Sequence, residues 1–201
     1  CALSRLTSVP ALPMESPRGI NDPWLRGATN CLERADLVLL LGKRFDFTLG
    51  TTAAPVFDSN CRLVQIDADA LELRAHESVV SSFEADPLAA ARMLTAGAAG
   101  RSWNGSGWRE EIEGGRAALP EAWQELGSNG ELPMHPLAIC EALRGWLDDD
   151  AVFVCDGGEV GQWMQAGLDA KYRLINGPAG AIGSSIGLGL AAQLAYPEKR
   201  V

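Results

Sequence analysis

The sequence is poor in positive charge and in histidine. It has 17 Lys and Arg against 26 Asp and Glu, so its 201 residues carry a net charge of −9, and it contains two histidines. A duplex-binding surface needs a dense stripe of Lys and Arg, and no such stripe is present, so we expect no nucleic-acid partner. Binding to an anionic membrane surface is disfavoured for the same reason.

Disulfide and zinc patterns are also missing. The five cysteines, at positions 1, 31, 61, 140 and 155, form no C-x-x-C pair, and an odd number with wide spacing does not indicate a disulfide framework. The opening residues, CALSRLTSVP, lack a charged region followed by an apolar core, so no secretory signal is indicated. We therefore expect reduced thiols and a cytoplasmic protein.

Only one apolar stretch approaches the length of a membrane span, AGAIGSSIGLGLAAQLA at residues 179–195. Ser184, Ser185 and Gln193 interrupt it, and its glycines would weaken an isolated helix. We expect a buried helix that packs closely on a sheet, with Gly187 and Gly189 at the contact, and no membrane partner.

Short apolar runs alternate with helical stretches along the rest of the chain. This pattern predicts an α/β fold with parallel sheets. Two helix starts are marked by proline at the first helical position: Asp86 is the expected N-cap before Pro87, and His135-Pro136 opens another helix. The expected strands are Leu37–Leu41, Arg62–Asp67, Val79–Phe83, Ala151–Cys155 and Tyr172–Ile175, and the expected helices cover 29–35, 69–76, 86–95, 108–126 (interrupted near Gly114), a segment from 136, and 160–168.

Composition divides the chain into three blocks. Residues 1–100 and 134–201 carry the strands, whereas residues 101–133 are rich in Gly, Ser and Glu and are predicted to form a helical linker. The final residues, Lys199-Arg200-Val201, are typical of the start of a further strand. We therefore expect the sequence to be truncated at this end.

Two glycine-rich turns follow strands in the third block. Asp156-Gly157-Gly158-Glu159 and Gly180-Ala181-Ile182-Gly183 each connect a strand to a helix. Ligands of open parallel sheets bind at the carboxyl ends of the strands, where glycine lets backbone N–H groups approach a phosphate. Two such turns at one edge could face one extended, phosphorylated cofactor. For either turn alone, a purely geometric role of the glycines is an equal alternative.

These segments resemble thiamine-diphosphate-dependent enzymes of the acetolactate synthase / benzoylformate decarboxylase type. In the first block the resemblance rests on ADLVLLLGKRFDFTLG, VQIDAD and ADPLAAARML. In the third block it rests on MHPLAICEALRGWLDDDAVFVCDGG and GPAGAIGSSIGLGLAAQLAYPEKRV. It implies an N-terminally incomplete, Rossmann-like central domain (1–100), the helical linker (101–133), and the N-terminal part of a diphosphate-binding domain (134–201).

The resemblance also implies site residues. Gly157, Gly158 and Glu159 match the loop that meets the diphosphate, although Glu159 departs from the family's Gly-Gln-His-like sequence. Gly180 matches the residue whose carbonyl receives the pyrimidine amino group. Ile182, after Ala181, matches a bulky apolar wedge under the cofactor; the alternative is a core residue at the start of a helix.

The implied parent enzyme is a decarboxylase or carboligase that uses thiamine diphosphate and Mg²⁺. Its small-molecule substrate would be a 2-oxo acid or a 2-hydroxyacyl thioester, and it would form a homo-oligomer. The family's activating glutamate and Gly-Asp-Gly…Asn metal motif are not in this sequence, so no catalytic or metal residue is named and the chain alone is expected to be inactive.

The alternative is a non-catalytic module that binds FAD or ADP in the central domain or serves assembly. Arg44 and Asp67 match positions that meet such a nucleotide in some family members. From the residues alone, a solvated loop explains Arg44 and a helix cap explains Asp67 better.

Overall fold

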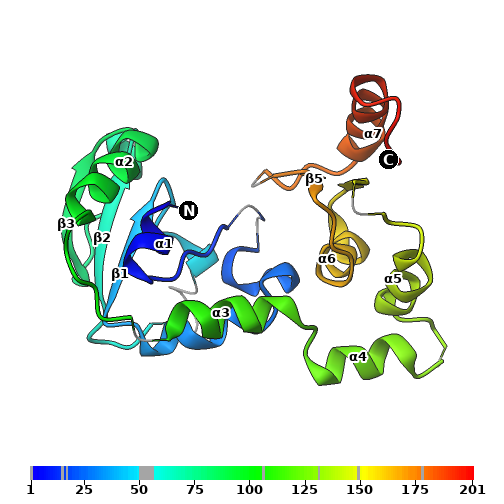
Figure 1. Ribbon diagram of the computed structural model, residues 1–201, viewed down its shortest axis with the longest axis horizontal. Coiled ribbons are helices and arrows are strands. Elements are labelled where there is room, and N and C mark those ends of the chain that lie inside the picture. Colours follow the sequence, from blue (N-terminus) through cyan, green and yellow to red (C-terminus); the bar gives the residue numbers. More distant parts are fainter. Residues whose placement is uncertain are drawn as a thin grey trace. The chain divides into compact units, whose positions relative to one another are not determined.

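The computed structural model describes residues 2–14, 16, 18–49, 57–105, 107–130, 132–148, 150–177 and 179–201. These residues form two compact units. The first comprises Cys1–Met14 and Ala28–Gly114, and the second comprises Glu15–Gly27 and Gly115–Val201. Each unit contains parallel strands and helices (Figure 1), so the predicted α/β class is confirmed.

The first unit is built on a three-stranded parallel sheet. Its strands β1 (Leu37–Leu41), β2 (Arg62–Asp67) and β3 (Val79–Glu84) lie in that order, with Leu39 opposite Val64. The apolar runs form strands because one side of the sheet is buried around Leu63 and Cys61. The helix α2 (Pro87–Ala98) follows β3 and packs against α1 (Ala2–Thr7).

Capping chemistry sets where the helices of this unit begin and end. The Asp86 side chain accepts a hydrogen bond from the Ala89 N–H at 2.7 Å, so the predicted start of α2 is confirmed. The helix predicted over 69–76 is only a 3₁₀ turn, η4 (Ala70–Glu72), because Leu73 is already extended. Another short 3₁₀ turn is η3 (Phe47–Leu49). The helix predicted over 29–35 falls, except for its last residue, within η2 (Pro23–Arg34), also of 3₁₀ type.

Two separate helices replace the single interrupted one predicted over 108–126. They are α3 (Trp108–Ala117) and α4 (Glu121–Ser128). The break lies just before Pro120 rather than at Gly114, because a proline disfavours helical geometry in the residue that precedes it. The Trp123 ring of α4 contacts the Trp163 ring edge-on at 5.0 Å, and α4 lies within the second unit.

The second unit contains two parallel strands and four helices among its described residues. The strands β4 (Val152–Cys155) and β5 (Tyr172–Ile175) pair, and α5 (Pro136–Arg144) lies alongside α6 (Gly158–Gly167) (Figure 1). The helix begins at His135-Pro136, as the sequence predicts, and His135 caps it by accepting from the Leu137 N–H. Leu137, Cys140 and Leu168 form the core between α5 and α6.

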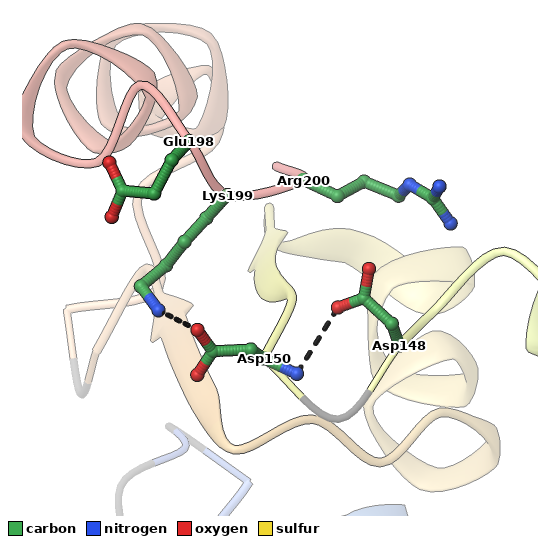
Figure 2. A pocket seen from close by; sticks show the side chains of 5 residues that line it. All are labelled: Asp148, Asp150, Glu198, Lys199 and Arg200. Carbon is green, nitrogen blue, oxygen red and sulfur yellow. Dashed lines mark hydrogen bonds and ion pairs between the residues drawn. The ribbon is translucent and has the colours of Figure 1, made fainter.

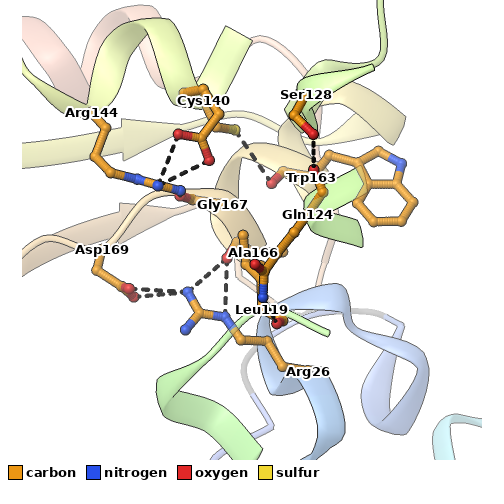
Figure 3. A network of polar contacts seen from close by, with 11 residues as sticks. Arg26, Leu119, Gln124, Ser128, Cys140, Arg144, Trp163, Ala166, Gly167 and Asp169 are labelled. Carbon is orange, nitrogen blue, oxygen red and sulfur yellow. Dashed lines mark hydrogen bonds and ion pairs between the residues drawn. The ribbon is translucent and has the colours of Figure 1, made fainter. Parts of the chain in front are cut away.

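The segment Glu15–Gly27, which the sequence placed in the central domain, belongs to this second unit. Arg26 explains the difference: its guanidinium donates to the Ala166 carbonyl at 2.7 Å and pairs with Asp169 at 3.0 Å (Figure 3). The Arg26 side chain is 5% exposed. Its backbone has a φ of +51°, which kinks η2 where one unit gives way to the other. A short 3₁₀ turn, η1 (Gly19–Asn21), precedes η2.

The glycine-rich helix α7 (Ser184–Ala195) is not buried as predicted. Ile186, Leu190 and Leu194 are 82%, 63% and 74% exposed, and a Cβ placed at Gly187 or Gly189 would meet no atom within 4 Å. The predicted packing role of these two glycines is therefore wrong, because α7 contacts β4 and β5 with another side, on which Ala192 is buried. None of the described helices is long and apolar enough to cross a bilayer.

Candidate functional site

The two glycine-rich turns of the second unit lie together at the carboxyl ends of β4 and β5. A Cβ built on Gly157 would lie 2.5 Å from Asn176 Nδ2 and 3.3 Å from both the Gly180 carbonyl oxygen and Ile182 Cγ1. A side chain at position 157 would therefore displace the Asn176 amide and crowd the second turn. The structure thus brings Gly157 of the first turn against Gly180 and Ile182 of the second, and the missing side chain of Gly157 favours this close approach.

The first turn leads into a helix whose amino end no side chain caps. Gly157 occupies the N-cap of α6 without a side-chain hydrogen bond, and Gly158 has a φ of +84° that favours glycine. The first N–H groups of a helix have no partner within the helix and carry a partial positive charge. This end of α6 therefore suits an anionic group.

The Asp156 carboxylate connects the two turns. Its Oδ1 accepts from the Gly157 N–H at 2.8 Å, and its Oδ2 accepts from the Gly183 N–H at 2.7 Å and from Ser185 Oγ at 2.9 Å. These hydrogen bonds, that from Gly157 foremost, lower the pKa of Asp156, so it is ionised at neutral pH. Sequence reasoning treated Asp156 only as part of a turn, although its place between a strand and paired glycines was a usable signal.

The second turn presents its apolar side chain to solvent. Ile182 is 79% exposed, so the alternative of a core residue does not hold in this structure. Gly180 has a φ of +63°, and the Ala181 carbonyl accepts from Asn176 Nδ2 at 3.2 Å. The Ile182 side chain is therefore available to a ligand that lies across the two turns.

Glu159, which departs from the family pattern, is paired rather than free. Its carboxylate forms an ion pair with Arg18, which comes from the segment Glu15–Gly27. The same segment reaches α6 a second time, since Ser16 Oγ donates to Gln162 Oε1 at 3.3 Å. The Arg18 charge offsets the negative charge that Glu159 brings to the amino end of α6.

Arg44 and Asp67, which match nucleotide-binding positions of some family members, both contact residues of the first unit. Arg44 Nε pairs with a Glu72 carboxylate oxygen at 3.0 Å. Asp67 Oδ1 accepts from the Asp69 N–H at 3.0 Å, just before η4. The Arg44 side chain is 66% exposed, in line with the solvated loop expected from the residues. Asp67 is not the cap of η4, because that position is Asp69, whose side chain accepts from the Leu71 N–H at 2.9 Å.

A charged hollow of about 340 Å³ opens in the second unit beside the amino end of β4. Figure 2 shows how its side chains pair: Lys199 meets the Asp150 carboxylate, and the Asp150 N–H donates to Asp148 Oδ1 at 3.1 Å. Glu198 and Arg200 complete its lining. Because ligands of parallel sheets bind at the opposite, carboxyl ends of the strands, this hollow is not the cofactor site.

The described ranges contain buried thiols and no cluster of metal-ligating side chains. Those ranges contain no cluster of three or more His, Cys, Asp or Glu side chains that could hold a metal ion. Cys61, Cys140 and Cys155 are buried free thiols, and burial raises their pKa, that of Cys140 to about 11. Cys1 and the Cys31 side chain lie outside what the structure describes.

Comparison with known proteins supports the resemblance. No protein-family model matches the chain. A probable acetolactate synthase from Mycobacterium bovis is 31% identical over 180 residues, which cover 88% of this chain and 32% of that protein. The 2-hydroxyacyl-CoA lyase 1 of Mus musculus is 25% identical over 205 residues, which cover 96% of this chain and 35% of that protein.

A solved structure shows the same fold. It is the thiamine diphosphate-dependent 4-hydroxybenzoylformate decarboxylase of Rhodococcus jostii RHA1, with a TM-score of 0.56 and 17% identity, covering 98% of this chain and 38% of that one. The resemblance expected from the sequence is thus confirmed: the chain is a relative of acetolactate synthases and 2-hydroxyacyl-CoA lyases and spans about a third of their length.

Proposed function

We propose that this chain is part of a thiamine-diphosphate-dependent decarboxylase or carboligase that acts on a 2-oxo acid or a 2-hydroxyacyl thioester. The observation that carries the proposal is the approach of the two glycine turns at the carboxyl ends of β4 and β5. The relatives support it, since those compared above are all named as enzymes of this chemistry. Residues 134–201 would form the N-terminal part of the diphosphate-binding domain.

The residues present fit the proposed cofactor. Gly157, Gly158 and Glu159 would hold the diphosphate at the uncapped amino end of α6, and Arg18 would offset the Glu159 charge. Gly180, Ala181 and Ile182 would face the rings, with the exposed Ile182 side chain as an apolar support. When bound, the cofactor supplies a carbon nucleophile for the substrate carbonyl and a ring that accepts electrons as carbon dioxide or an aldehyde leaves.

The proposal extends to the metal ion, the assembly and the location of the protein. Mg²⁺ would accompany the diphosphate, held by residues outside those described here. The protein would act as a homo-oligomer in the cytoplasm, on a small-molecule substrate. A nucleotide-binding role for the first unit is the weaker alternative, because Arg44 and Asp67 are engaged in contacts within that unit.

Ligand-dependent melting tests the proposal directly. Thiamine diphosphate with Mg²⁺ is expected to raise the melting temperature, since a ligand at a hundredfold excess over its Kd stabilises the folded state by about 2.7 kcal/mol. Thiamine with Mg²⁺ is the matched control, because it lacks the diphosphate that α6 would hold. A shift with FAD or ADP, and none with thiamine diphosphate, would favour the nucleotide-binding alternative instead.

An activity assay tests the expectation that the chain alone is inactive. Purified chain, with cofactor and Mg²⁺, is expected to release no carbon dioxide from pyruvate or benzoylformate. The reason is that the described residues offer no metal cluster and the sequence lacks the activating glutamate of the family. Sustained, cofactor-dependent release by a clean preparation would contradict this expectation.

A further inference from the structure

The second glycine turn has little apolar packing to hold it in place. Gly180 and Gly183 have φ values of +63° and +97°, and Ile182 is 79% exposed. Other hydrogen bonds of this turn are longer: the Gly180 N–H donates to the Gly177 carbonyl at 3.1 Å, and the Ala181 carbonyl accepts from Asn176 Nδ2 at 3.2 Å and from Ser184 Oγ at 3.5 Å. Polar contacts must therefore fix this turn.

The Asp156 carboxylate supplies the shortest of these contacts. It accepts from the Gly183 N–H at 2.7 Å and from Ser185 Oγ at 2.9 Å, across 27 and 29 residues of sequence. Its other oxygen accepts from Gly157 at 2.8 Å. Hydrogen bonds to an ionised acceptor are about twice as strong as neutral ones, so one carboxylate bridges the two turns.

We propose that Asp156 is a positioning residue that fixes the second glycine turn, with Ile182 and the Gly180 carbonyl, against the first. The inference rests on the proposed function, because the cofactor rings would lie on this second turn. The carboxylate binds the N-cap N–H groups of both helices, Gly183 of α7 and Gly157 of α6, and leaves the N–H groups that follow Gly157 in α6 to an external anion.

This arrangement gives Asp156→Asn a distinctive signature. The amide keeps one carbonyl oxygen, which can accept from the Gly157 N–H, but its NH₂ group cannot accept from Gly183 or Ser185, so the second turn loses its anchor. We expect affinity for thiamine diphosphate with Mg²⁺ to fall about tenfold, and affinity for inorganic pyrophosphate with Mg²⁺ to stay within about twofold. Protection of the Gly183 amide in NMR hydrogen exchange is expected to fall about tenfold without any ligand.

Two further variants control the measurement. Asp150→Asn removes the same charge from the same unit, at a carboxylate that pairs with Lys199 and Lys171, and is expected to change none of the three readouts by more than about twofold. Ser185→Ala removes one donor and keeps the Asp156 carboxylate. It is expected to reproduce the pattern at about threefold, and it replaces Asp156→Asn should that variant not fold.

The binding and hydrogen-exchange results distinguish the role of Asp156 from the proposed function. Equal losses of thiamine diphosphate and pyrophosphate binding would mean a general structural role and overturn the proposal. Unchanged thiamine diphosphate binding in Asp156→Asn would overturn it as well, while the proposed function would stand. If the wild-type chain binds no thiamine diphosphate, the proposed function fails, and unchanged Gly183 protection in Asp156→Asn would separately remove the bridge between the turns.

Discussion

At the scale of single residues, exposure decides what Ile182 does. Because it is 79% exposed, Ile182→Ala removes no buried methylenes and is expected to change stability by less than about 0.5 kcal/mol. In the intact parent enzyme we expect the rate of the chemical step to fall more than cofactor affinity. The reason is that a rigid apolar support acts on the geometry between the reacting groups.

The measurement is single-turnover kinetics beside cofactor titration in the parent enzyme, after the melting temperature of the variant has been checked. Leu194→Ala, at the far end of α7 and 74% exposed, is the matched control and should leave both quantities unchanged. A stable Ile182→Ala enzyme with normal affinity and normal turnover would remove the wedge role of Ile182.

Burial likewise decides the chemistry of Cys140. Its pKa is raised to about 11, so the folded protein keeps this thiol protonated and unreactive near neutrality. We expect alkylation at pH 8, mapped by mass spectrometry, to spare Cys140 in the folded protein and to label it in denaturant. Labelling at the same rate in both states would contradict the burial.

The same shift has a consequence for stability. The unfolded thiol ionises near pH 8.5, below the folded value, so the unfolded state loses its proton first. The contribution of Cys140 is therefore fully present below about pH 8.5 and is lost as pH rises toward about 11. The free energy of unfolding of Cys140→Ala should lack this part of the alkaline decline.

At the scale of secondary-structure elements, Gly167 lets α6 end against α5. A Cβ at this position would lie 2.6 Å from Cys140 Sγ and 3.0 Å from Leu137 Cδ2. Gly167→Ala is expected to lower the free energy of unfolding by about 1–3 kcal/mol, because the helices must separate or strain. Urea denaturation monitored by tryptophan fluorescence measures the change.

Gly114→Ala provides the matched comparison within a helix. A Cβ at Gly114, inside α3, would meet nothing within 4 Å, so we expect stabilisation by about 0.5–1 kcal/mol from lost chain entropy in the unfolded state. If both substitutions change stability equally, the close α5–α6 contact at Gly167 is wrong.

At the scale of the whole molecule, the exposed side of α7 favours association. Ile186, Leu190 and Leu194 follow one another at intervals of four residues, which places them on one side of the helix, and each is more than half exposed. Large exposed apolar patches promote association, so we expect a dimer or higher oligomer by light scattering. Leu190→Glu is expected to shift the protein toward monomer.

Leu88→Glu is the control for that change. Leu88 is 59% exposed on α2 of the first unit and lies outside the α7 row. A wild-type protein that stays monomeric across a tenfold dilution series would contradict the expectation. Equal dissociation by both charged variants would remove α7 as its cause.

Local sequence patterns are sufficient to predict the strands and the starts of two helices. The apolar runs at Leu37–Leu41 and Arg62–Asp67 became β1 and β2 without change, and Asp86 and His135 cap the helices they were expected to begin. These features depend on neighbours in the chain, and so local pattern is sufficient to predict them. The family resemblance rested instead on longer segments of the first and third blocks and on their order along the chain.

Which segments that are far apart in the sequence come into contact depends on the tertiary structure. No local pattern shows that Arg26 donates to the Ala166 carbonyl, and this contact assigns Glu15–Gly27 to the second unit. The bridge from Asp156 to Gly183 and Ser185 is of the same kind. Burial of α7 was predicted from its composition and is wrong, because composition gives the length and polarity of a helix but not which elements cover it.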